Sequence, residues 1–348
     1  MKIINCKFEV VTPMFLSGAD NNKAEIRAPS IKGLLRFWWR AIVGAKLKYE
    51  KNEIKDKEER LFGTSLEDKE KKKGASKFSI KITKLESYKN RGIRSPKLDK
   101  NLKVSSAGHL VSPIDYLGYG VYLWNKKNKA VETSRAFFDS GTKFNISFIF
   151  SKPIDKNEEE EFLKALWGLV NFGGLGSRSR KGFGSTLLLN RKDIFAPLGD
   201  EFTTSLVEPK LIDKIKNSYN GLPPYTGFSK NSIYLQFKPQ NSWQDALALV
   251  GKYYITGRKI LPTRKRIFLG YPLSNIKFDN KLQRRASPYF IHVAFHNNSF
   301  VPTILYLPAR FSPTLFKDEK INEVDQKFLS INQRFLNEIS KYAINIRG

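Results

Sequence analysis

The chain opens with a strand-like alternation of apolar and polar residues over residues 2–12. Four apolar residues, Ile4, Cys6, Phe8 and Val10, fall on one side of that alternation. A period of two is typical of a strand with one buried face. The sequence therefore predicts that the protein begins with a half-buried strand.

A helical pattern follows a polar loop. Its apolar positions recur at spacings of three and four residues: Ile31, Leu34, Leu35, Trp38 and Ile42. This spacing places them on one face of a helix. Ser30 is predicted to cap the helix, because a serine hydroxyl accepts a hydrogen bond from a free amide of the first turn. Gly44 is predicted to end it.

The same two periodicities predict further strands and helices along the chain. Strands are expected at 77–85, 142–150, 186–191, 232–239, 289–296 and 301–309, and helices at 158–170, 242–255 and 325–344. The stretch 86–140 is predicted to be rich in loops, with one strand-like patch at Tyr119–Trp124. The first 200 residues thus follow the order β-α-β, β-α-β, which is the ferredoxin-like split βαβ motif.

We therefore predict an α+β protein of two tandem ferredoxin-like domains that resemble RNA-recognition modules. Each would have a four-stranded antiparallel sheet with helices on one face. Residues 1–200 would form the first domain, 201–230 a linker, and 231–348 a degenerate second copy that follows the order β-α-β-β-α.

Charge is the main compositional signal. The chain has 61 Lys and Arg against 33 Asp and Glu, a formal net charge of +28. Such an excess of positive charge repels itself, and it usually persists because a polyanion binds the surface. Nucleic acid is favoured over a membrane surface, since we find no basic amphipathic tail. A basic proteome would be the alternative explanation.

Cys6 is the only cysteine, which excludes an internal disulfide and a cysteine-rich zinc site. The chain shows no signal-peptide core and no apolar run long enough to span a membrane. We expect a cytoplasmic protein that uses neither a metal nor another cofactor.

The first group of basic residues lies on the predicted helix after the opening strand. Lys32, Arg36 and Arg40 are spaced four residues apart and share one face, and Arg27 precedes them. No acidic residue occurs from 26 to 49. We expect this face to contact an RNA backbone, although an ordinary solvated face is the alternative.

The second group lies in a glycine-rich segment, FGGLGSRSRKGFGS, at residues 172–185. Its glycines and cations are Gly173, Gly174, Gly176, Gly182 and Gly184, with Arg178, Arg180 and Lys181 between them. Glycines allow a ligand to approach the backbone closely, and amides and guanidinium groups suit phosphates. The segment fits neither a Walker A loop nor a Rossmann fingerprint. We expect phosphate binding rather than a flexible connector, because the three cations have no evident structural purpose.

The third group is spread over residues 246–317, which hold a single acid, Asp279. Its basic residues are Arg258, Lys259, Arg264, Lys265, Arg266, Arg284 and Arg285. Tyr253, Tyr254, Phe268, Tyr271 and Tyr289 are interleaved with them. Rings and cations together suit a single strand, because bases stack on rings while phosphates contact the cations. About half of these aromatics are expected in the core instead.

The histidines give little indication of catalysis. His292 and His296 lie on one face of a predicted strand, but no further metal ligand stands near them in the sequence. His109 lies in a predicted loop and could act as a general base on a 2′-hydroxyl, yet a lone histidine in a loop seldom does.

Three segments resemble members of the RAMP superfamily, and in particular the first RAMP subunit of the type III-B CRISPR Cmr effector complex. They are VTPMFLSGAD with KAEIRAPSIKGLLRFWWR, GGLGSRSRKGFG, and LGYP with RRASPYFIHV and LPARF. The resemblance covers both ends of the chain but not 86–140. It implies two ferredoxin-like domains and a place near the 3′ end of the guide in a complex assembled on CRISPR RNA, with target cleavage by another subunit.

On this sequence the resemblance assigns RNA contacts to three sets of residues. They are Arg27, Ser30, Lys32, Arg36 and Arg40; then the glycines and cations of 173–184; and, more distantly, Arg284 and Arg285. We expect a non-catalytic subunit whose partners are guide and target RNA and other Cmr subunits, with no membrane and no small-molecule substrate. A metal-independent CRISPR RNA endonuclease and a basic protein scaffold are the alternatives.

Overall fold

The computed structural model describes residues 1–64, 74–83, 85–106, 109–216, 218–271, 284–311 and 318–344. The strands are β1 (Lys2–Val10), β2 (Phe78–Thr83), β3 (Val104–Ser106), β4 (His109–Val111), β5 (Tyr122–Asn125), β6 (Ala130–Thr133), β7 (Lys143–Phe150), β8 (Thr186–Leu188), β9 (Ile233–Gln236), β10 (Tyr289–His296) and β11 (Ser299–Tyr306). The helices are α1 (Ala28–Lys46), α2 (Lys51–Phe62), α3 (Pro113–Leu117), α4 (Lys156–Phe172), α5 (Arg191–Phe195), α6 (Pro209–Lys216), α7 (Trp243–Lys259) and α8 (Asp318–Ser340). Short 3₁₀ turns lie at Lys100–Leu102, Ala196–Leu198, Asp200–Phe202 and Thr263–Leu269.

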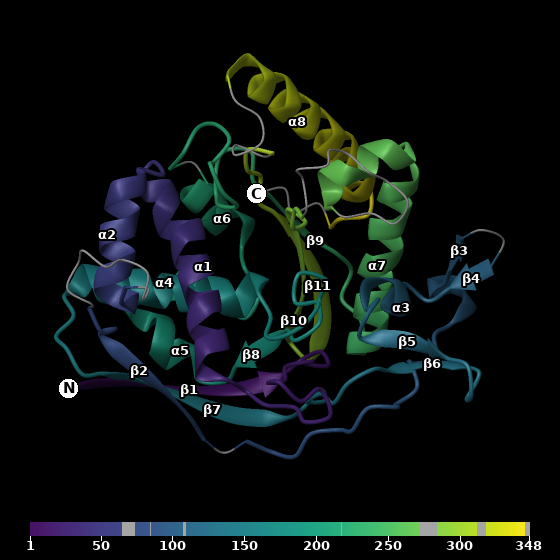
Figure 1. The fold of residues 1–348 in the computed structure, drawn as a ribbon, viewed down its shortest axis with the longest axis horizontal. Coiled ribbons are helices and arrows are strands. Elements are labelled where there is room, and N and C mark those ends of the chain that lie inside the picture. Colours follow the sequence, from purple (N-terminus) through teal and green to yellow (C-terminus); the bar gives the residue numbers. More distant parts are fainter. Residues whose placement is uncertain are drawn as a thin grey trace.

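The first sheet is built from the alternating strands that the sequence predicts. Its strand order is β2-β7-β1-β8, and each neighbouring pair is antiparallel. Cys6 of β1 lies opposite Ile146 of β7, and both point into the core. Helices α1 and α4 cover this buried face (Figure 1). The prediction of an α+β fold with antiparallel sheets is confirmed.

The second sheet has the order β10-β11-β9 and is also antiparallel. The predicted β-α-β-β-α pattern gives this half three strands, whereas the predicted ferredoxin-like fold calls for four; three strands form the sheet in the part of the chain that the structure describes. Helix α7 follows β9, and α8 is the last described element. Neither of these two long helices crosses a membrane: no described helix is long and apolar enough to do so.

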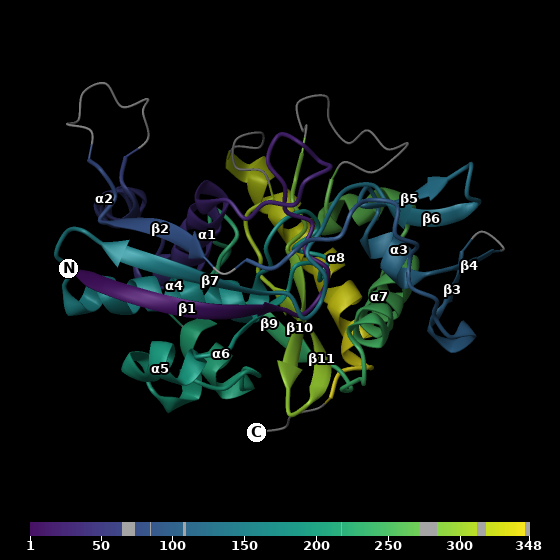
Figure 2. The ribbon, with the colours of Figure 1, turned by 90° about the horizontal axis from the view of Figure 1, so that it is seen from below.

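The stretch 86–140 is more ordered than predicted. It forms two small antiparallel hairpins, β3–β4 and β5–β6, with α3 between them. Helix α3 packs against α7 of the second sheet, at the end of the molecule away from α2 (Figure 2). The segment is an insertion between β2 and β7, and it reaches across to the second half of the chain.

Buried side chains gather into two cores that do not divide at one point of the chain. The first core contains Cys6 and Trp38, and also Leu211 and Phe228 from the predicted linker. The second core contains Tyr254 of α7 together with residues of the first half, such as Phe15 and Phe183. The segment 201–230 therefore forms α6 and packs against the first sheet's core. The domain boundary itself stays a prediction.

The start of α1 differs from the prediction. The helix begins at Ala28, its N-cap residue is Arg27, and no side chain caps it. Pro29 occupies the first turn, where its fixed φ suits the helix and its missing amide hydrogen costs nothing. The predicted capping role of Ser30 is wrong, because Ser30 already lies inside the helix.

Candidate nucleic-acid interface

The glycine-rich segment forms a tight loop between α4 and β8. Gly182 has a φ of +85°, a conformation that residues with a Cβ rarely adopt. Gly174 does not have a positive φ, but a Cβ there would lie 2.7 Å from the carbonyl oxygen of Phe183. Glycine is required at both positions, for different reasons.

This loop is held between the two sheets. The Thr12 hydroxyl donates to the Gly182 carbonyl at 2.7 Å, and the amide of Ile291 in β10 donates to the Arg180 carbonyl at 3.1 Å. His292 Nδ1 lies 2.8 Å from the Gly173 carbonyl. Burial lowers the pKa of His292 to about 4, so this histidine is neutral at physiological pH. These contacts exclude a freely moving connector.

Two of the three loop cations have structural contacts. Arg180 donates from Nη1 to the Ser287 carbonyl at 2.6 Å, and its guanidinium lies 4.5 Å from the ring centre of Phe290. Burial lowers the pKa of Arg180 to about 10. Lys181 donates to the Tyr254 hydroxyl at 2.8 Å. The expectation that the cations have no structural purpose is wrong for these two residues.

A pocket of about 530 Å³ opens beside the loop. It is lined by Gly176, Ser177, Arg178, Ser179, Arg180, Lys181, Arg284, Ala286 and Ser287, and we call it the basic pocket. No carboxylate is among these lining residues. Arg178 and Arg284 are exposed at it. Burial, together with the nearby positive charge of Arg284, lowers the pKa of Arg178. The structure thus joins the second and third predicted groups.

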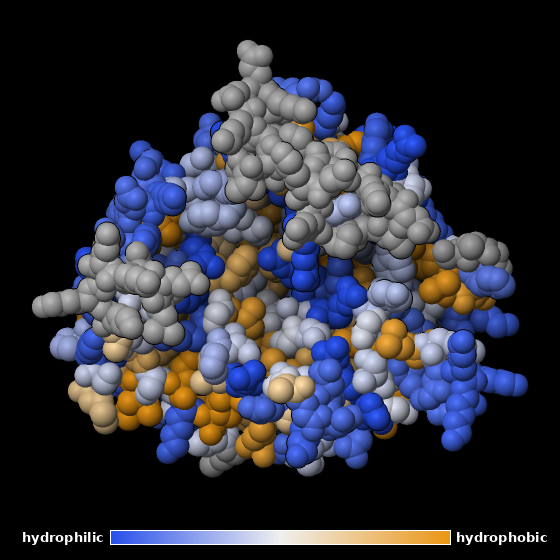
Figure 3. Space-filling view, in the orientation of Figure 1, coloured by the Kyte–Doolittle hydropathy of each residue, from blue (hydrophilic) through white to orange (hydrophobic). Residues whose placement is uncertain are grey.

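Arg258 of α7 adds a further positive charge near the basic pocket. It is hydrogen bonded to the hydroxyls of Tyr254 and Tyr116. Burial raises the pKa of Tyr254, but the neighbouring Lys181 and Arg258 cations outweigh burial and lower it to about 8. In Figure 3 strongly hydrophilic side chains lie in a hollow between α1 and α7, and others are spread over the rest of this face.

The remaining residues of the third group lie in different surroundings. Arg285 is half-buried, and it donates to the backbone carbonyls of Ala309, Arg310 and Phe311. Arg266 donates to the Leu261 carbonyl at 3.1 Å. Lys259 and Arg264 are exposed, and the Lys259 ammonium contacts the Ser105 carbonyl.

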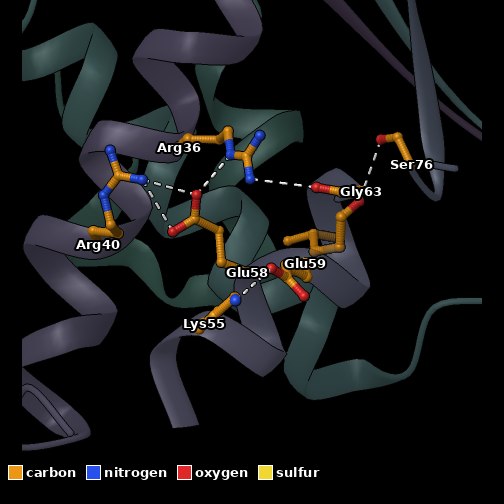
Figure 4. Close-up of polar contacts among 8 residues, drawn as sticks. Arg36, Arg40, Lys55, Glu58, Glu59, Gly63 and Ser76 are labelled. Atoms are coloured by element: carbon orange, nitrogen blue, oxygen red, sulfur yellow. Dashed lines mark hydrogen bonds and ion pairs between the residues drawn. The ribbon is translucent and has the colours of Figure 1, made fainter. Parts of the chain in front are cut away.

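The first predicted group has an acidic partner that its own sequence segment lacks. Glu58 of α2 accepts from Arg36 Nε at 2.6 Å and from Arg40 Nη1 at 2.8 Å (Figure 4). Its side chain is 8% exposed. The interpretation of this helix face as free of acids is therefore wrong, because the fold brings Glu58 of α2 against it. Arg36 and Arg40 hold α1 to α2, and their positive charge is partly neutralised.

The other two cations near α1 are less constrained. Lys32 lies 5.6 Å from the ring centre of Phe78, and burial, with Arg36 as a second cause, lowers its pKa. Arg27 is exposed and lies 3.7 Å from a Glu25 carboxylate oxygen. These two residues do not line the basic pocket.

The histidines do not converge on one site. His109 pairs with Ser106 in the β3–β4 hairpin, His292 is buried in β10, and His296 Nδ1 lies 2.8 Å from the Ser205 hydroxyl. Nor do the described residues bring together any group of three His, Cys, Asp or Glu that could hold a metal ion.

Sequence reasoning missed several residues of the basic pocket and its rim. Ser177, Ser179 and Ser287 line the pocket, and Tyr119, which is 70% exposed, lies beside Arg178. The signal for Tyr119 was present in the sequence, because a tyrosine between two glycines, Gly118 and Gly120, has little neighbouring side chain to cover it.

Comparison with known proteins places these features in a family context. The model of the RAMP superfamily matches residues 7–187. Two Pyrococcus furiosus proteins are similar to this chain: CRISPR system Cmr subunit Cmr1-1 is 27% identical over 83% of this chain and 82% of its own length, and Cmr1-2 is 31% identical over 51% and 90%.

Two solved structures share the fold. The apo crystal structure of Cmr1 from Pyrococcus furiosus matches with a TM-score of 0.59 and 23% identity, over 95% of this chain and 97% of that chain. A chain of the type III-B Cmr-beta complex, solved bound to cognate target RNA and AMPPnP in the presence of ssDNA, matches with a TM-score of 0.53 and 14% identity, over 97% and 99%.

Proposed function

This chain belongs to the RAMP superfamily and, within it, to the Cmr1 subunits of CRISPR Cmr complexes, and from that premise we propose that it is a non-catalytic subunit that binds RNA. The RNA is the guide or target strand of the complex, and the partners are the other Cmr subunits. The similar chain in the Cmr-beta structure comes from a complex bound to target RNA, which supports this assignment.

The basic pocket is the observation that carries the proposal. Arg178 and Arg284 are exposed there, Arg180 and Lys181 line it, and no lining residue is acidic. Guanidinium groups bind phosphates through charged hydrogen bonds, and the serine hydroxyls of the same wall add neutral donors. Phosphate contacts position a nucleic acid without reading its sequence. We therefore infer that the pocket holds the RNA backbone.

The other predicted contact residues contribute less to the proposed RNA binding. Arg27 and Arg264 are exposed and extend the positive surface beyond the pocket. Arg36 and Arg40 contribute less, because Glu58 neutralises part of their charge. Arg285 donates its hydrogen bonds to carbonyls of the protein's own backbone.

We further propose that the two sheets are two ferredoxin-like units. β1, β2, β7 and β8 occupy the places that the first, second, third and fourth strands take in the β-α-β-β-α-β order. β9, β10 and β11 repeat the places of the first three. The proposed second unit would then lack its fourth strand.

The proposal of no catalysis is supported by the separation of the three histidines. A general base must lie within hydrogen-bond reach of the hydroxyl it activates, and neither His109 nor His292 lines the basic pocket. Tyr254, whose pKa is lowered to about 8, is buried and cannot reach a 2′-hydroxyl.

Salt dependence tests the binding proposal. The logarithm of the affinity for single-stranded RNA should fall linearly with the logarithm of salt concentration. In the variant Arg178→Ala/Arg284→Ala the slope should shrink by about 1.4, which corresponds to roughly 0.7 for each lost phosphate contact. The control variant Lys156→Ala/Lys192→Ala removes two exposed charges that do not line the pocket, and it should keep the wild-type slope.

Two results would contradict the proposal. One is an affinity that barely changes with salt, or that falls equally in both double variants. The other is metal-independent cleavage of a labelled RNA by the purified protein that His109→Ala abolishes, because that result would favour the endonuclease alternative.

A further inference from the structure

We propose that Tyr119 is a base-stacking position at the rim of the basic pocket, and that the pocket therefore takes single-stranded RNA with an unpaired base rather than duplex RNA. This inference rests on the proposed function and names the class of ligand that the same site accepts.

The backbone around Tyr119 is restrained although its ring is exposed. The amide of Tyr122 donates to the Gly118 carbonyl at 2.8 Å, and the Ser134 hydroxyl donates to the Gly120 carbonyl at 2.9 Å. Gly120 has a φ of +95°, which turns the chain sharply after the tyrosine. A ring on a fixed turn loses little conformational entropy when a ligand stacks on it.

Tyr119 lies next to the cation that opens the pocket. The guanidinium carbon of Arg178 is 6.0 Å from the centre of the Tyr119 ring, and a Cβ added to Gly120 would lie 3.3 Å from Arg178 Nη2. Arg135 joins the same insertion to the loop, because its Nη1 donates to the Ser177 hydroxyl at 3.2 Å. A base on the ring would thus place its phosphate within the reach of Arg178.

The open face of the first sheet does not offer such a ring. Four-stranded RNA-recognition modules stack bases on aromatic residues of the sheet surface. Here the outward-facing positions of β1 and β7 are Ile3, Asn5, Lys7, Glu9, Lys143, Asn145, Ser147 and Ile149. None is aromatic, so these two central strands offer no ring for stacking, whereas Tyr119 supplies an exposed ring beside the cations.

The geometry favours an unpaired strand for a chemical reason. Bases in an RNA duplex are stacked on each other and hide their faces, whereas a single strand can turn a base onto a protein ring while its phosphates contact cations. Trp124 of β5 is similarly exposed, at 61%, but among the described residues no cation lies over its ring. It therefore serves as a control aromatic in the same insertion.

The test measures binding of a labelled oligouridylate of about 16 nucleotides, the upper size of one single-strand site, and of the same strand in a duplex with oligoadenylate. Tyr119→Ala should weaken single-strand binding about tenfold, with an unchanged salt slope because no charge is lost. Duplex binding should stay unchanged. Tyr119→Phe, which keeps the ring, and Trp124→Ala should both bind like wild type.

The outcomes separate the two proposals. If wild-type protein binds the single strand with a steep salt dependence but Tyr119→Ala binds equally well, or loses single-strand and duplex affinity alike, the stacking inference is overturned and the proposed function stands. If wild-type protein binds neither probe, the proposed function itself fails. Thermal unfolding of each variant should match wild type, because the Tyr119 ring is exposed.

Discussion

Lys181 donates a hydrogen bond of 2.8 Å to the hydroxyl of Tyr254, and its ammonium also lies 4.1 Å from the centre of the same ring. Lys181 belongs to the glycine-rich loop before β8, and Tyr254 belongs to α7. This one pair therefore links the first sheet to the helix of the second. The loop that lines the basic pocket is held in place by one of its own cations.

The Lys181–Tyr254 pair should make stability depend on pH. The folded-state pKa of Tyr254 is about 8, below the value of roughly 10 for an unfolded tyrosine. Burial also lowers the pKa of Lys181. Between pH 8 and 10 the unfolded chain binds more protons at both groups, so the free energy of unfolding rises with pH. Relative to Lys181→Met/Tyr254→Phe, we expect a rise of about 2 kcal/mol.

Urea unfolding of both proteins at pH 8 and pH 10 measures this difference. The comparison with the double variant subtracts the other tyrosines, several of which have pKa values raised by burial and act in the opposite direction. An identical change of stability with pH in the two proteins would show that the pair does not titrate as described.

Glu58 should matter for stability far more than an exposed glutamate on the same helix. Removing it in Glu58→Ala leaves Arg36 and Arg40, which are 29% and 37% exposed, facing each other without a carboxylate. Breaking a buried ion pair costs roughly 3–5 kcal/mol, and we expect about 2 kcal/mol because both guanidinium groups are partly solvated. The matched control is Glu53→Ala, whose carboxylate is 50% exposed and should cost less than about 0.5 kcal/mol.

Denaturant unfolding of the two variants checks this prediction. Equal losses of stability in Glu58→Ala and Glu53→Ala would mean that Glu58 does not hold α1 to α2.

Glycine positions offer a second stability test. Gly182→Ala should destabilise the protein by at least about 2 kcal/mol, because φ is +85° and the new Cβ would lie 2.6 Å from Leu247. Gly33→Ala in α1 should instead stabilise it by roughly 0.5–1 kcal/mol, since beyond its chain neighbours and the helix's own backbone no atom lies within 4 Å of the new Cβ. Shifts of the thermal midpoint in opposite directions are expected, and shifts in the same direction would contradict the assigned backbone conformation.

The sequence predicted those elements in which the apolar pattern repeats over enough residues to be recognised. The alternation at Ile4 and Cys6 became β1, and the apolar spacing of 158–170 lies within α4. In 86–140 the predicted strand-like patch Tyr119–Trp124 overlaps β5, but the other strands of the two hairpins were missed because strands of three or four residues show no clear period. The fourth strand of the second sheet was expected only by analogy with the first, and analogy does not specify which residues would pair.

The candidate site shows why individual contacts are harder to predict. The acid that pairs with Arg40 lies 18 residues away on another helix, so the local absence of acids was misleading. Lys181 belongs to a run of charged residues that the sequence suggests is exposed, yet it packs against Tyr254, 73 residues away. A one-dimensional pattern identifies the basic segments, but only tertiary packing decides which cations contact protein and which face solvent.

Arg284 and Arg285 are neighbours in sequence with opposite expected roles. The Arg285 guanidinium lies 4.6 Å and 4.8 Å from the ring centres of Phe311 and Phe328, and it donates to three backbone carbonyls. Arg285→Ala should therefore lower the free energy of unfolding by about 3 kcal/mol, because those carbonyls and rings lose their partner. Its RNA salt slope should remain that of wild type.

Arg284→Ala should give the converse result. Arg284 is exposed on the basic pocket, so its loss should change stability by less than about 0.5 kcal/mol while the RNA salt slope falls by about 0.7. Urea unfolding and RNA binding should be measured on both variants. Arg285→Lys should be hardly more stable than Arg285→Ala, because an ammonium cannot reproduce the planar fork of donors of a guanidinium. If Arg285→Ala reduces the salt slope while Arg284→Ala does not, the RNA backbone follows a path on the Arg285 side, and the basic pocket is not where it binds.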